Sequence, residues 1–142
     1  MTSSVPAPFP EPTQDERTMA TLAHALQFVG SFIAPLVIFL IKRESRFVTF
    51  HALQAILLQL TFLIVAFGSM MVFFVAIMAT LPAHGSNNPP FAVFFFPLIW
   101  LVLMGGHVTV LVLAIVYAVK AGKGEWAGYP IIGGLARRIL GM

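Results

Sequence analysis

The sequence predicts an all-α integral membrane protein with three transmembrane helices. Of its 142 residues, 59% are hydrophobic and only 9% are charged, whereas a soluble domain carries roughly 25% charged residues. Two long tracts have no formal charge at all, one between Arg17 and Lys42 and one between Arg46 and Lys120. Tracts of this kind are typical of lipid-embedded helices, which need about 20 apolar residues per span.

The first predicted span covers residues 18–41. Thr18 is a suitable N-cap, and two acidic residues just before it suit the positive end of a helix dipole. At about 1.5 Å per residue the segment is just long enough to cross a bilayer. Gly30, Ser31 and Pro35 fall in its middle, so we expect a kink near the centre.

The second and third spans are predicted at residues 51–80 and 92–119. The second is longer than the hydrocarbon core requires, so it must tilt or protrude. Between the two lies LPAHGSNNPP, whose prolines, glycine and asparagines predict turns. The domain organisation is therefore a tail at 1–17, a three-helix domain at 18–119 and a tail at 120–142.

Both tails have features of their own. Prolines at every second position from Pro6 to Pro12 favour extended backbone in the first tail, which we expect to be extracytoplasmic. In the last tail, Ile131, Leu135 and Ile139 recur at helical spacing beside two arginines. This pattern allows a C-terminal helix that lies in the membrane interface.

The distribution of basic residues predicts the orientation. Seven basic residues lie on one side of the three predicted spans, and Arg17 alone lies on the other. The seven are Lys42, Arg43, Arg46, Lys120, Lys123, Arg137 and Arg138. By the positive-inside rule the N-terminus is outside and the C-terminus is cytoplasmic. We therefore expect a multi-pass protein of the bacterial cytoplasmic (inner) membrane.

Polar residues inside the second span are the first candidate functional residues. His51, Gln54 and Gln59 share one side of a helical wheel with small residues. Such a face is typical of helix packing through interhelical hydrogen bonds. A solute or ion path along the same face is the alternative.

The histidines are the candidates for binding a ligand. His24, His51 and His107 are expected at three different depths, which disfavours a bis-histidine haem within one chain. A pigment or other ligand held by a single histidine remains an open alternative. His107 is the best candidate, because Gly105 and Gly106 before it permit close approach of a flat ring or of another helix.

Catalysis is not expected. The three predicted spans contain no Asp or Glu, and the chain contains no cysteine. Carboxylate pairs, proton relays and thiolate chemistry are therefore excluded from the membrane. The tail sequence GKGEWAG lacks the strand and helix context of a phosphate-binding loop. We predict neither a catalytic residue nor a metal site, and the basic residues are too few and too close to the spans to indicate nucleic-acid binding.

Two segments resemble a known family. They are ERTMATLAHAL with APLVIFLIKRESRFVTFHALQA, and AVKAGKGEWAGYP near the C-terminus. This pattern resembles the bacterial membrane proteins of domain-of-unknown-function family 4870, which are related to the chloroplast import component Tic-twenty. The sequence departs from that family at Leu57-Leu58-Gln59, where members carry Asn-Phe-Gln. The resemblance implies a three-helix fold and an analogy to protein import.

We therefore expect a non-catalytic accessory or structural subunit of a larger membrane complex. Its predicted partners are other membrane subunits and lipid, with a homo-oligomer as a further option, and no soluble substrate is identified. The alternative is a component of a transport or protein-translocation assembly. Packing predicts that the face with His51, Gln54 and Gln59 is protected from water, whereas transport predicts that it is wet.

Overall fold

The computed structural model describes residues 9–81 and 91–142, and every regular element within them is helical. This confirms the all-α prediction. In chain order the elements are α1 Gln14–Ala25, α2 Gln27–Gly30, α3 Ile33–Ile41, α4 Arg46–Thr80, the 3₁₀ helix η1 Phe91–Phe95, α5 Phe96–Gly122 and α6 Ile132–Leu140. The predicted turn residues from 82 onward and the first eight residues of the proline-rich tail lie outside the described part of the chain.

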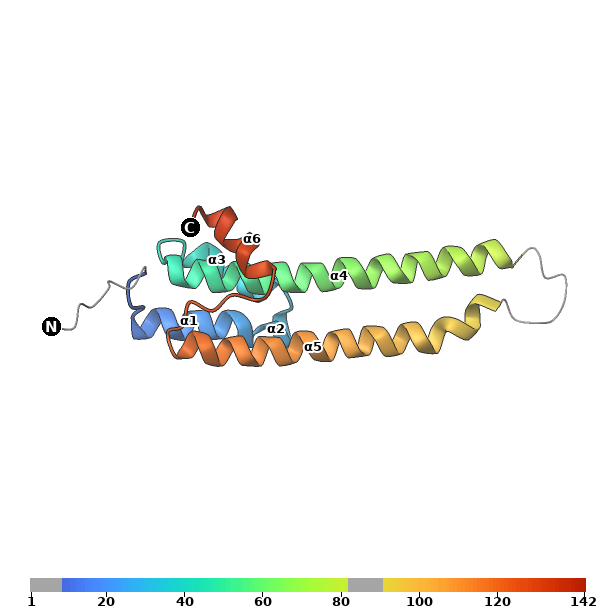
Figure 1. The fold of residues 1–142 in the computed structure, drawn as a ribbon, viewed down its shortest axis with the longest axis horizontal. Helices are drawn as coiled ribbons and strands as arrows, with labels where there is room; N and C mark the ends of the chain where they lie inside the picture. The colour runs from blue at the N-terminus through green and yellow to red at the C-terminus, as the bar shows by residue number, and fades with distance from the viewer. Residues whose placement is uncertain (1–8, 82–90) are drawn as a thin grey trace.

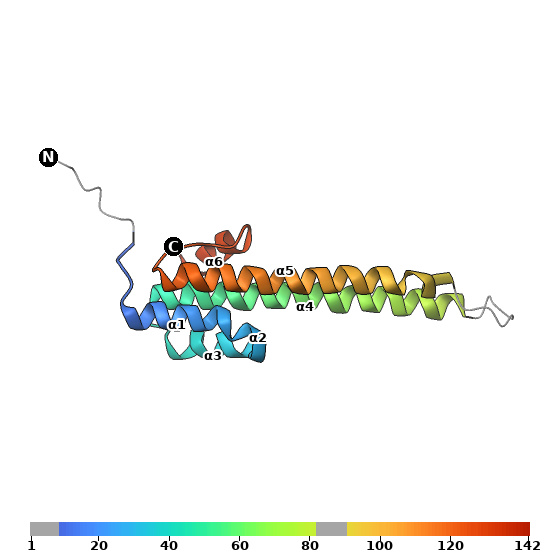
Figure 2. The same cartoon turned by 90° about the horizontal axis from the view of Figure 1, so that it is seen from below.

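Two long helices set the shape of the molecule. In Figure 1, α4 and α5 run side by side along the whole length, and α1, α2, α3 and α6 gather at one end. Figure 2 shows α1–α3 on one side of the α4–α5 pair and α6 on the opposite side. Among the described residues, α4 and the segment Phe91–Gly122 are the helices long and apolar enough to cross a membrane. The membrane class is thus supported, but a third transmembrane helix is not confirmed.

The prediction of one continuous helix over residues 18–41 was wrong. The structure divides this segment into α1, α2 and α3, and the chain reverses so that α3 runs back beside α1. With 12 and 9 residues, α1 and α3 are about 18 Å and 14 Å long. Neither length spans a hydrocarbon core of about 30 Å.

The reversal occurs where the sequence predicted only a kink. Ser31 has φ 50° and ψ −133°, a conformation outside the helical region. Pro35 has no backbone N–H, so in a continuous helix it would leave the carbonyl of Ser31 unpaired. A new helix that begins at Ile33 places Pro35 in the first turn, where backbone N–H groups have no intrahelical partner anyway.

The start of α1 also differs from the prediction. Thr13, not Thr18, is the N-cap, and its side chain accepts a hydrogen bond from the Glu16 backbone N–H at 3.3 Å. In return the Glu16 carboxylate accepts from the Thr13 N–H at 2.7 Å. This capping box satisfies two backbone donors and begins the helix one turn earlier.

The ends of the 18–41 segment lie together, which corrects the reasoning behind the predicted orientation. Lys42 Nζ lies 2.7 Å from Asp15 Oδ2, and Ser45 Oγ donates to Glu16 Oε1 at 2.6 Å. The first residues of α1 and the loop after α3 are therefore at the same end of the molecule, where α4 begins and α5 ends.

This arrangement gathers every formal charge of the sequence at one end. The eight basic and five acidic residues all lie before or at the start of α1, in the loop before α4 or at its first residue, at the end of α5 or in the segment through α6. We call this the charged end. The opposite end, where α4 stops and η1 begins, is the distal end, and its connection, residues 82–90, contains no Lys, Arg, Asp or Glu.

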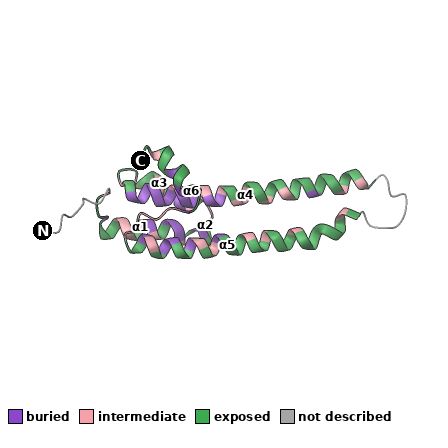
Figure 3. Ribbon diagram, viewed as in Figure 1, coloured by how far each residue is buried: buried purple, intermediate pink, exposed green. Residues whose placement is uncertain are grey.

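The core lies entirely towards the charged end. The buried residues of α4 run from Phe47 to Gln59, with Phe73 as the one exception, and those of α5 run from Val110 to Ala121. Beyond them both long helices are mostly exposed and apolar, as the green ribbon in Figure 3 shows. A surface of this kind is stable in lipid and not in water.

Candidate functional site

A cluster of buried polar side chains lies where α1, α4 and the segment after α5 meet. His24 and His51 are fully buried, and Tyr129 is 2% exposed. The Tyr129 hydroxyl is 2.9 Å from His24 Nδ1, and His24 Nε2 is 3.0 Å from His51 Nδ1. His51 Nε2 is in turn 3.1 Å from the Glu125 carbonyl oxygen. We call these groups the polar cluster.

The Glu125 carbonyl sets the direction of the whole chain of hydrogen bonds. A carbonyl can only accept, so His51 Nε2 carries the proton and donates to it. With both rings neutral, His51 Nδ1 accepts from His24 Nε2–H, and His24 Nδ1 accepts from the Tyr129 hydroxyl. In this arrangement all four ring nitrogens are used, so neither ring offers a free lone pair to a metal.

Gln54 extends the cluster along α4. Its side-chain oxygen accepts from the Tyr129 backbone N–H at 2.7 Å, and its amide donates to the Phe50 and Ala127 carbonyls at 3.3 and 3.4 Å. Gln54 is fully buried. It thus provides the hydrogen bonds that the irregular segment after α5 cannot make with itself, as buried backbone groups require.

The two tyrosines close the cluster on the α5 side. The Tyr117 hydroxyl donates to the Gly128 carbonyl at 2.9 Å, and the Tyr117 and Tyr129 rings lie with centroids 4.1 Å apart. Burial raises the pKa of Tyr129 above its ordinary value, because a phenolate would be poorly solvated there. Tyr129 therefore stays a neutral hydrogen-bond donor. Its side chain faces inward, towards His24.

The predicted depths of the histidines were wrong for one pair. His24 and His51 were expected at different depths, but the reversal between α1 and α3 brings their rings to a centroid distance of 5.3 Å. Sequence reasoning also missed Tyr129 as their partner. The sequence did contain one indication of such a partner: a histidine buried in an apolar segment needs a hydrogen bond to another polar group.

The remaining predicted site residues lie apart from this cluster. Gln59 is 7% exposed on α4. His107 is exposed on α5, and its ring lies 5.5 Å from that of Phe62. A Cβ on Gly106 would also meet the Phe62 ring, at 3.3 Å, whereas one on Gly105 would meet nothing within 4 Å. Gly106 thus permits a close approach within the chain, and Gly105 and His107 face outward.

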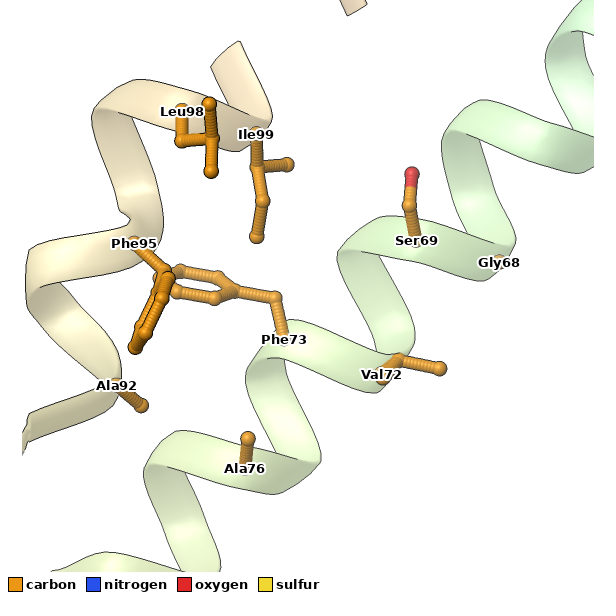
Figure 4. A pocket seen from close by; sticks show the side chains of 9 residues that line it. All are labelled: Gly68, Ser69, Val72, Phe73, Ala76, Ala92, Phe95, Leu98 and Ile99. Carbon is orange, nitrogen blue, oxygen red and sulfur yellow. The ribbon is translucent and has the colours of Figure 1, made fainter. Parts of the chain in front are cut away.

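An open apolar groove of about 450 Å³ lies between α4 and the η1–α5 segment towards the distal end. In Figure 4, Phe73 of α4 and Phe95 of η1 project into it from the two sides. The one hydroxyl that lines it, that of Ser69, donates to backbone carbonyls of its own helix. The groove therefore offers only apolar surface, which suits lipid chains or another apolar helix.

The described residues contain no group of three or more His, Cys, Asp or Glu side chains placed to hold a metal ion. The polar cluster joins α1 and the segment after α5 to the first four turns of α4, and it satisfies polar groups that would be costly to leave unpaired away from water.

Residues 15–136 match the family model described as the magnetosome magnetite crystal formation protein family, MamF/MmsF. The match covers most of the chain, so the chain belongs to this family. No curated protein and no solved structure matches it. The family match overturns the resemblance to domain-of-unknown-function family 4870 and to Tic-twenty.

Proposed function

We propose that this protein is a non-catalytic accessory subunit of the membrane apparatus that forms magnetite crystals. The family match over residues 15–136 carries the proposal. It implies a membrane-associated role in magnetite formation, and the two long apolar helices are the means of membrane attachment. Other membrane subunits and lipid are the partners that such a role requires.

The segregation of charge supports one topology. Every Lys and Arg lies at the charged end, and positive residues near membrane helices are retained in the cytoplasm. In this proposal α4 and α5 cross the bilayer as a hairpin. The charged end, with both the N-terminal segment and α6, lies on the cytoplasmic side, and the uncharged connection at 82–90 lies on the other side. The helical segments α1–α3 enter the membrane from the cytoplasmic side and return to it.

A non-catalytic role is supported by how the polar groups are used. In the polar cluster the imidazole nitrogens, the Tyr129 hydroxyl and the Gln54 amide all bind one another or the backbone. The distal end presents apolar side chains and no carboxylate. The face with His51 and Gln54 is sealed within the chain, which favours packing over a water-filled path.

The topology is tested by single-cysteine labelling, for which the natural absence of cysteine gives a clean background. Glu11→Cys, Arg138→Cys and Leu81→Cys place exposed thiols near the two chain ends and at the end of α4. In intact cells a membrane-impermeant maleimide should reach Leu81→Cys from the non-cytoplasmic side only, and it should reach the other two only after the cytoplasm is opened. Labelling of Glu11→Cys and Arg138→Cys from opposite sides would reject the hairpin topology.

The role is tested by complementation. In cells that lack the gene, the natural chain should restore the size distribution of the crystals, measured by electron microscopy. His107→Ala should restore it equally, because His107 is exposed and is the one histidine in the described structure outside the polar cluster. Loss of restoration by His107→Ala at normal protein level would point to a chemical role. Equal crystals with and without the natural chain would reject a role in magnetite formation.

A further inference from the structure

The two halves of the molecule differ greatly in width. Towards the charged end, α1, α3 and α6 pack around α4 and α5, whereas towards the distal end the short η1 is the one further element among the described residues (Figures 1 and 2). The burial pattern gives the same division, since, apart from Phe73, the buried residues stop at Gln59 on α4 and begin at Val110 on α5.

The depth of the wide half follows from the helix lengths. The ion pair between Asp15 and Lys42 fixes the open end of the α1–α3 hairpin at the level of the headgroups. From Asp15 to Val29 at its tip, the arm formed by α1 and α2 reaches about 21 Å inward at most. This is about the distance from the headgroups to the middle of a bilayer whose full thickness is about 40–45 Å. The hairpin therefore occupies one leaflet and leaves the other free.

The outer surface of this hairpin is made for lipid. Val29 at its tip is 90% exposed, Ile33 is 59% exposed and Ile41 is 71% exposed. On the other side of the molecule, Ile131, Leu135 and Ile139 of the α6 region are 93%, 48% and 57% exposed and lie at a spacing of four residues. Arg137 and Arg138 beside them are suited to anionic headgroups. The α1–α3 hairpin and α6 thus both add to the width of the protein in the same leaflet.

The difference in area can be estimated. A helix about 10 Å across occupies about 80 Å² of the membrane plane, so the α1–α3 hairpin alone adds about 160 Å² to one leaflet. The other leaflet receives only α4 and α5. From this shape we propose that the protein is a membrane wedge that binds preferentially to bilayers that are convex on the side of its charged end. The proposal rests on the membrane placement given under Proposed function, by which that side is the cytoplasmic one.

The wedge is tested with the full chain, fluorescently labelled at its C-terminus and inserted into giant vesicles of neutral and anionic phospholipid. A narrow tube is pulled outward from each vesicle, and protein density on the tube is compared with density on the vesicle, each divided by the signal of a lipid dye. With the charged end outward, the ratio should rise to about two or more, which corresponds to about 0.4 kcal/mol. With the charged end inward, it should fall below one.

The reversed orientation is the matched control, because it contains the same protein, lipid and tube. Orientation is measured by labelling Arg138→Cys with an impermeant maleimide. A ratio of one in both orientations would overturn the wedge while leaving the membrane placement intact. Chain that is washed off the vesicles at alkaline pH would overturn the placement itself, and the wedge with it. Enrichment on the tube in both orientations would also contradict the wedge, since an asymmetric shape predicts enrichment in one orientation and depletion in the other.

Discussion

Two adjacent glycines of α6 give the sharpest test of how the C-terminal segment packs. A Cβ on Gly133 would lie 2.7 Å from Gly128 Cα and 2.9 Å from its carbonyl carbon. These are backbone atoms, so the segment would have to shift, and overpacking of this kind costs about 1–3 kcal/mol. A Cβ on Gly134 would meet nothing within 4 Å. Either alanine gains up to about 1 kcal/mol of helix propensity.

Because that gain is common to both variants, it cancels in their comparison. Gly133→Ala should be less stable than Gly134→Ala by about 1–3 kcal/mol, and Gly134→Ala should equal or exceed the natural chain. Denaturant unfolding in a mild detergent, followed by tryptophan fluorescence, measures the difference, and hydrogen exchange of the α6 amides locates it. Equal stability of the two variants would refute the close contact between Gly128 and Gly133.

Three further predictions test the charged end. Tyr129→Phe leaves the buried His24 Nδ1 without its donor and should lower the free energy of unfolding by about 1–3 kcal/mol; an unchanged unfolding midpoint would contradict the directional chain of hydrogen bonds. The Ser45 hydroxyl is the main cause that lowers the pKa of Glu16 below its ordinary 4.5, so this interaction stabilises the fold above that pH and is lost as the pH falls through the lowered pKa. Ser45→Ala should therefore lower the free energy of unfolding more at neutral pH than in acid. Ser45 is also the N-cap of α4, and loss of this cap alone would lower the free energy of unfolding equally at both pH values, so unfolding measured at both distinguishes the two effects. In the double variant Asp15→Cys and Lys42→Cys, a short bis-maleimide should join the two thiols, because Asp15 and Lys42 form an ion pair here. In a straight helix the two positions would be about 40 Å apart. Absence of the cross-link would therefore favour a single span over residues 18–41.

Composition and charge spacing were sufficient for the class of the protein but not for the path of its first segment. Hydropathy over residues 18–41 is the same whether the segment crosses the bilayer or turns back within it. The distinction lies in contacts between residues far apart in sequence, such as Asp15 with Lys42 and His24 with His51. A pattern read along one helix cannot show such pairs, so the kink at Ser31 was recognised but not its full extent.

Of the polar cluster, the sequence indicated the residues on α4 but not their partners. The wheel placed His51 and Gln54 on a face that packs, and the structure buries both. Their partners could not be read from that wheel, because Tyr129 and the carbonyls of Glu125 and Ala127 lie in an irregular segment. In such a segment, no periodicity shows which backbone group turns inward.

The polar cluster and the wedge depend on each other. A straight helix over residues 18–41 would carry His24 into the bilayer without the partners it has here, at a cost of several kcal/mol for an unpaired polar group. Turning back instead places His24 against His51 and Tyr129, and the same turn confines α1–α3 to one leaflet. In the proposed placement α4 and α5 cross the membrane without help from the cluster, so weakening the cluster should reduce the width of the charged end before it affects anchoring. On this proposal the hydrogen bonds at Tyr129 maintain the asymmetric shape on which the curvature preference depends, while the apolar length of α4 and α5 maintains attachment.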